Sequence, residues 1–212
     1  MSEYEYSVFD VDSYEPICDE DWAVEFTRRG VGLKIERPVA VLAKSWAMAS
    51  AIAAIPTNLL GHLNEKEGIW DKVKQRTSSR QTIYHAQSGA FVLFFNAYET
   101  FMQESTLATL DLKVEASMKR FPNFPAAFAA AFGNELLAVC WHDPGVQFFM
   151  DVRNSFTNYG GSASPHYSET DHDIVVNNGF LKMRKNENDF LITHLHPIVV
   201  QFIDAVAGLN KD

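Results

Sequence analysis

The residues best suited to chemistry in this chain lie in the stretch DVRNSFTNYGG, residues 151–161. Arg153 is the only Lys or Arg within residues 121–181, and Asn154 follows it directly. A guanidinium offers a planar fork of donors that fits a phosphate and the charge developing on it during cleavage. Arg153, with Asn154 and Asn158 as polar neighbours, is therefore the first candidate for a functional site.

The element that carries Arg153 is predicted to be a helix over residues 145–158. Phe149, Val152 and Phe156 recur at helical spacing and define a stripe that should be buried. Arg153 lies one turn after Phe149, at the border of that stripe. An Arg in this position needs acceptors, because removing its charge from water without them is unfavourable.

Glu99 is the natural partner for that Arg. It is the only charged residue within residues 81–103 of the strongest predicted helix, residues 80–105. Aromatic side chains recur in this helix at spacings of three and four, which predicts a buried central helix. We expect Glu99 and Arg153 to interact. The alternative to a functional Arg153 is a structural one, which pairs with Glu99 or caps a helix end.

The two segments together resemble a HEPN domain. The similarity lies in FFNAYETFM, residues 94–102, followed at a distance by VRNSFTNYGG and then by a polar loop and a hairpin. The resemblance implies an all-α bundle, usually dimeric, of a family with many metal-independent endoribonucleases. Other members are non-nuclease modules that bind partners or nucleotides. Arg153 and Asn154 match the family's Arg-Asn pair, and Asp151 matches an acid often found two residues earlier.

This chain departs from the family pattern at position 158, where Asn158 stands in place of the usual His. A His can exchange a proton with the ribose or the leaving oxygen, whereas Asn cannot near pH 7. Five residues turn a helix by about 500°, so Arg153 and Asn158 share a phosphate only if the helix ends between them or two copies meet. We expect Gly160-Gly161 to supply that ending. His166, thirteen residues after Arg153 in a loop, could fold back as a substitute base, but nothing in the spacing requires it. The chain should then be a weak or inactive ribonuclease, or else a non-catalytic protein–protein interaction module.

Histidines and acids near the carboxyl end could bind a metal. Their spacing matches no specific metal signature, and solvated loop histidines are the alternative. We therefore expect neither a metal nor a cofactor. The candidates are His166, His172, Asp173, His194 and His196, of which the last two could share one face of a strand.

Composition limits the class of protein. The chain has 212 residues and 47% hydrophobic residues, which suits one domain with a sizeable core. Residues 1–25 carry nine acids and no Lys or Arg, and the remainder carries 18 of each sign. This balance gives no bulk support for nucleic-acid binding, which needs clustered cations. The longest apolar stretch is interrupted by Lys44, and the acidic start lacks a signal-peptide pattern. We therefore expect a cytoplasmic protein with no membrane segment and with free thiols at Cys18 and Cys140.

The fold class predicted from these patterns is mainly α, a HEPN-like helical bundle. Residues 1–37 are predicted to form an acidic N-terminal segment with short strands, two of them around a turn at Arg29-Gly30. The alternative for residues 1–20 is an acidic tail that stays partly mobile. Residues 38–212 are predicted to form the bundle, with a β-hairpin near 174–184 at Asn178-Gly179. A closing helix should follow, with Pro197 near its start.

The expected partners follow from the same features. We expect a homodimer, since an aromatic central helix suggests spare apolar surface and the family resemblance points the same way. RNA or a nucleotide is the expected ligand, and a second protein is the alternative partner.

Overall fold

The computed structural model describes residues 21–63, 79–111, 123–163, 176–177, 179–181 and 185–209. Within them the protein is mainly helical, as predicted, with seven helices and one pair of two-residue strands. The elements in chain order are α1 (Asp21–Gly30), α2 (Glu36–Leu63), α4 (Ser79–Thr109), α5 (Phe124–Phe132), α6 (Asn134–Cys140), α7 (Pro144–Tyr159), β1 (Val176–Asn177), β2 (Phe180–Leu181) and α8 (Lys185–Leu209).

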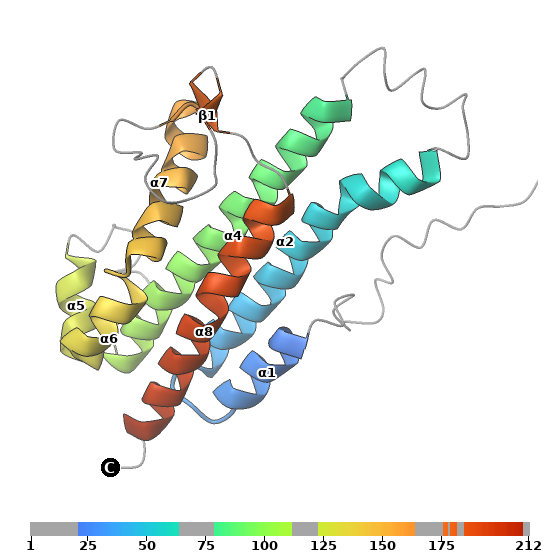
Figure 1. Ribbon diagram of the computed structural model, residues 1–212. Coiled ribbons are helices and arrows are strands. Elements are labelled where there is room, and N and C mark those ends of the chain that lie inside the picture. Colours follow the sequence, from blue (N-terminus) through green and yellow to red (C-terminus); the bar gives the residue numbers. More distant parts are fainter. Residues whose placement is uncertain are drawn as a thin grey trace, which may run out of the picture.

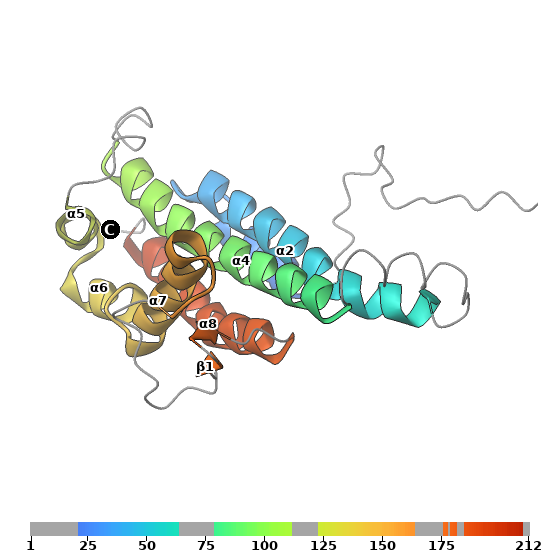
Figure 2. The ribbon, with the colours of Figure 1, turned by 90° about the horizontal axis from the view of Figure 1, so that it is seen from above.

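The long helix α4 organises the bundle. It packs against α2, α5, α7 and α8, while α1 packs against α2 and α8 (Figure 1). Seen from above, α5, α6 and α7 lie on the side of α4 away from α2 (Figure 2). The five aromatic residues that α4 places in the core are at most 1% exposed, which confirms the predicted buried central helix. They are Phe91, Phe94, Phe95, Tyr98 and Phe101.

The prediction of two short strands within residues 22–37 is wrong, because residues 21–30 form the helix α1. Trp22 and Phe26 are four residues apart and both pack on Trp46 of α2, which requires helical spacing. Gly30 is not a hairpin residue. It ends α1 against Val39, whose Cγ1 would lie 2.9 Å from a Cβ at this position. Residues 1–20, where the other predicted strand falls, lie outside the described residues.

Helix α2 begins at Glu36 and continues through Pro56 to Leu63. The expectation that Pro197 lies near the start of the closing helix is wrong. Helix α8 begins at Lys185, so Pro197 lies inside it instead of near its start. A proline removes one hydrogen-bond donor, and tertiary packing on both sides of it can hold the helix together.

Gly133 separates the two short helices α5 and α6. This residue has φ 89° and ψ 162°, a backbone conformation that is open to glycine and strained for other residues. The break lets α5 and α6 point in different directions, so that Phe132 reaches Phe202 of α8 with ring centroids 4.9 Å apart.

Two antiparallel strands pair Val176 with Leu181 and Asn177 with Phe180. Gly179 has φ 81°, as expected for a residue in a tight turn. The rest of the hairpin predicted near 174–184 stays a prediction, because residues 174–175, 178 and 182–184 lie outside the described part of the chain.

A buried polar cluster joins three helices. The side chain of Gln87 on α4 donates from Nε2 to the carbonyl oxygen of Ala53 on α2 at 2.7 Å. Asn188 on α8 donates from Nδ2 to Oε1 of Gln87 at 2.7 Å. Pro56 removes the donor that would bond the carbonyl of Ile52, four residues earlier, and the Gln87 amide donates to the adjacent carbonyl of Ala53. The cluster therefore joins α2, α4 and α8.

Candidate functional site

Capping residues next to helix α7 fix where it begins and ends. Asp143 caps its start, with its side chain accepting a hydrogen bond from the Val146 N–H at 3.1 Å, and Pro144 occupies the first turn. Gly160 ends the helix in the left-handed conformation, with φ 61°. The helix predicted for residues 145–158 is thus confirmed, and it extends one residue further at each end.

The interaction predicted between Glu99 and Arg153 is present. The guanidinium of Arg153 donates from Nη2 to Oε2 of Glu99 at 2.8 Å, across the contact between α7 and α4. Both side chains are largely covered, at 17% and 24% exposed. An ion pair shielded to this degree is stronger than one in open solvent.

The remainder of the Arg153 side chain also lies against α4. Its Cζ stands 5.5 Å from the centroid of the Phe95 ring, a cation–π distance. Its Nε is buried without a hydrogen-bond partner in the structure. The guanidinium is therefore held by a carboxylate and an aromatic face of its own chain.

Asn154 and Asn158 do not complete a site with Arg153. The helix ends at Tyr159, beyond Asn158, so the expectation that Gly160-Gly161 ends it between Arg153 and Asn158 is wrong. On a continuous helix a separation of five residues, about 500°, places these two on different faces. Asn158 is exposed, whereas Arg153 is directed to the α4 contact. His166, the proposed substitute base, lies outside the described residues.

His194 and His196 are on helix α8, so the strand that would have placed them on one face is not there. Each has its own carboxylate: His194 Nε2 lies 2.7 Å from Asp143, and His196 Nε2 lies 3.1 Å from Glu25. Among the described residues no three His, Cys, Asp or Glu side chains are grouped as a metal site would require. The other metal candidates, His166, His172 and Asp173, fall outside the described ranges.

An ionic network between α1 and α8 was missed at the sequence level. Arg29 pairs with Glu25 at 2.8 Å. Its Nη1 donates to both carboxylate oxygens of Asp204 at 2.7 Å. The hydrogen bond from Arg29, with a further one from His196, lowers the pKa of Glu25 despite partial burial. The i,i+4 spacing of Glu25 and Arg29 was a readable helix signal. The Asp204 contact was not, since it joins residues 175 positions apart.

The imidazole of His194, which pairs with Asp143, packs against the backbone of Gly145. A Cβ on Gly145 would stand 2.3 Å from His194 Nε2, so the imidazole occupies the space that a side chain would need. Burial raises the pKa of Asp143, but hydrogen bonds from His194 and from the Val146 N–H outweigh it, and the net pKa is lowered. The arrangement locks the start of α7 onto α8.

Cys140 was predicted to be a free thiol, and it is free and fully buried. Burial raises the pKa of its thiol to about 12, which leaves it unreactive as a nucleophile. The Tyr98 hydroxyl donates to the Cys140 carbonyl oxygen from within the core.

One helix in the described part of the chain, Glu187–Leu209 within α8, is long and apolar enough to cross a membrane by length and composition. Leu195, Val199 and Phe202 of this helix are buried in the bundle. Its opposite side carries the Asp204 carboxylate that pairs with Arg29. The helix therefore has one side packed in the bundle and another in contact with α1.

Comparisons with protein-family models, with curated proteins and with solved structures found no match to this chain.

Proposed function

We propose that this chain is a non-catalytic helical protein that acts by binding another protein. The exposed apolar side chains Val24, Val31, Val41 and Met48 support protein binding, and the position of Arg153 argues against catalysis. Its guanidinium is engaged by Glu99 at 2.8 Å and by the ring of Phe95, and the side chain is 17% exposed. These contacts are those of a residue that holds α7 against α4.

The chemistry of RNA cleavage supports the same proposal. Metal-independent cleavage needs a group that can accept and return a proton, and this help is typically worth about 10²–10⁴-fold. Asn158 has no such group, and it is exposed on a face of α7 that Arg153 does not share. An amide can hold a phosphate or a base by hydrogen bonds, which suits binding and not turnover.

Two variants test the structural role of Arg153. Arg153→Lys keeps the charge but loses the planar fork and the ring contact, so it should lower the thermal midpoint. Asn158→Ala, on the exposed face of the same helix, is the matched control and should leave the midpoint nearly unchanged. A midpoint that is insensitive to Arg153→Lys, together with RNA cleavage that depends on Arg153, would contradict the proposal.

A HEPN-like protein associated with RNA or a nucleotide is the second candidate. One observation favours it: the Arg153 side chain is not fully covered, and Glu99 takes a hydrogen bond from Nη2 alone. An anion could then contact the remaining edge of the guanidinium.

Restoring the family's His tests this second candidate. Asn158→His should raise cleavage of single-stranded RNA without added metal, and Arg153→Ala should abolish the gain. If a folded Asn158→His protein gains no activity, the structural role of Arg153 is favoured.

We also propose a homodimer in the cytoplasm that does not insert into a membrane. The argument from spare apolar surface on the central helix does not support the dimer, because the aromatic residues of α4 are buried within one chain. The proposal now depends on the family resemblance. Light scattering at tens of micromolar protein tests it, and a monomeric mass would count against it.

A further inference from the structure

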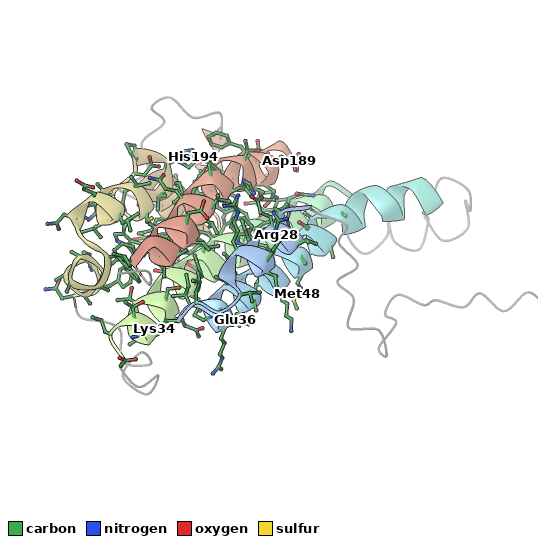
Figure 3. All side chains as sticks on the ribbon, turned by 90° about the horizontal axis from the view of Figure 1, so that it is seen from below. Arg28, Lys34, Glu36, Met48, Asp189 and His194 are labelled. Atoms are coloured by element: carbon green, nitrogen blue, oxygen red, sulfur yellow. The ribbon has the colours of Figure 1, made fainter. Side chains whose placement is uncertain are left out.

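The outer side of α1 and α2 combines exposed apolar side chains with cations that form no ion pair with any described residue. Figure 3 shows two of its residues, Arg28 on α1 and Met48 on α2, together with Glu36 at the start of α2. We call this surface the α1–α2 outer face. It comprises Val24, Arg28, Val31, Arg37, Val41, Lys44 and Met48, all of them exposed.

The cations of this face differ from the other basic residues nearby. Arg29 is neutralised by Glu25 and Asp204, and Lys34 lies 3.4 Å from Asp111. Within the described residues, Arg28, Arg37 and Lys44 have no ion pair. The face therefore has a local excess of positive charge in a chain whose net charge is −9.

The apolar residues of the face are unusual for this protein. Seven large hydrophobic residues are exposed in the described part of the chain, and four of them lie here. Val24, Val31 and Met48 are 65%, 64% and 61% exposed, and Val41 is 40% exposed. Arg37, Val41, Lys44 and Met48 follow one another at spacings of four and three, so basic and apolar groups alternate along one stripe of α2.

A binding partner for such a surface should carry acids and apolar side chains together, and residues 1–20 of this chain do so. They contain seven acids and no Lys or Arg, interleaved with Tyr, Phe, Val and Ile. The segment joins α1 directly at Asp21. Twenty residues can reach about 65 Å, whereas Arg37 and Met48 are about 16 Å apart along the helix axis, so the whole stripe is within reach. A tether of this length gives the segment an effective concentration of about millimolar at the face.

We propose that residues 1–20 bind the α1–α2 outer face of the same chain through paired charges and apolar contacts. This inference goes beyond the proposed function, since it requires no external partner. It adds a regulatory element, because an external acidic partner would have to displace the segment to use this face.

The test uses the full-length chain with a nitroxide at Ser2→Cys in a Cys18→Ser background. Cys140 is fully buried, so the label goes to one position. The methyl signal of Met48 should lose most of its intensity at low salt, while that of Met150 on α7 serves as the control and should keep its intensity. In about 1 M salt, where the Debye length is about 3 Å, the Met48 signal should recover.

Charge reversal at Arg28→Glu, Arg37→Glu and Lys44→Glu should restore the Met48 signal at low salt. If that variant does not fold, the salt titration on the unmodified face still decides. An unaffected Met48 signal at low salt overturns the inference. Broadening of the Met48 signal that survives charge reversal also overturns it. In a mixture of nitroxide-labelled chains and unlabelled, isotope-enriched chains, broadening of Met48 that appears only between the two kinds of chain overturns it as well, because the segment would then bind a second copy.

Discussion

The carboxylate of Glu99 and the guanidinium of Arg153 meet at 2.8 Å across the contact between α4 and α7. Each is largely covered by protein, and Arg153 also lies over the Phe95 ring. The pair therefore ties the central helix to the helix that carries the Arg-Asn motif. The same contact that makes Arg153 important for the fold reduces its freedom to act on a ligand.

Loss of this pair should destabilise the protein. We expect Arg153→Ala to lower the free energy of unfolding by about 1.5–3 kcal/mol, the range for hydrogen bonds to charged groups. A double-mutant cycle with Glu99→Gln, measured by urea unfolding, should give a coupling of about 1–2 kcal/mol. Coupling within error of zero would show that the two residues act independently.

Two glycine-to-alanine changes should have opposite effects. Gly145→Ala would place a Cβ 2.3 Å from His194 Nε2, so we expect a loss of about 1–3 kcal/mol from overpacking. Gly89→Ala is the matched control: this site is on α4 with nothing within 4 Å of the added Cβ, so helix propensity should add up to about 1 kcal/mol. Thermal unfolding of both variants measures the difference, and a neutral Gly145→Ala would mean that His194 moves aside freely.

The Gln87 side chain should matter because it joins α4 to both α2 and α8. Gln87→Ala leaves the Ala53 carbonyl without its side-chain donor in a buried position, which should cost about 1–3 kcal/mol. In an Asn188→Ala background the contact with Gln87 Oε1 is already lost, so the same change should cost less. Chemical denaturation of the four proteins in this cycle provides the test, and equal losses in both backgrounds would show that Gln87 and Asn188 act independently.

Stability should fall in acid partly through Glu25. Its pKa is lowered in the folded state from the ordinary value of 4.5, mainly by the hydrogen bond from Arg29. A lowered folded-state pKa means that the contribution is fully present above pH 4.5 and is lost as the pH falls through the folded-state value. Urea midpoints between pH 7 and pH 3 should show a smaller acid loss for Glu25→Gln. In an Arg29→Met background that difference should largely vanish, and its persistence would point to another cause.

The local pattern of the sequence was enough to predict the helix that carries Arg153 and the burial of the central helix. Phe149, Val152 and Phe156 repeat at helical spacing, and Asp143-Pro144 and Gly160 have chemistry suited to helix ends. The isolation of Glu99 and Arg153 on otherwise uncharged stretches was also enough to predict their contact, because each needed a partner of opposite charge.

Only the tertiary structure decided whether the Arg153 guanidinium is available to a ligand or engaged within the chain. Sequence spacing cannot show that Phe95 lies beneath the guanidinium, or that α7 continues past Asn158 and separates the two residues by face. The errors at residues 22–37 and at Pro197 have the same origin. Each local signal for a turn or a helix end was weak, about 1–3 kcal/mol, and contacts between distant segments outweighed it. Those contacts join Trp22 and Phe26 to Trp46, and His194 to Asp143, and no local window of the sequence contains both members of such a pair.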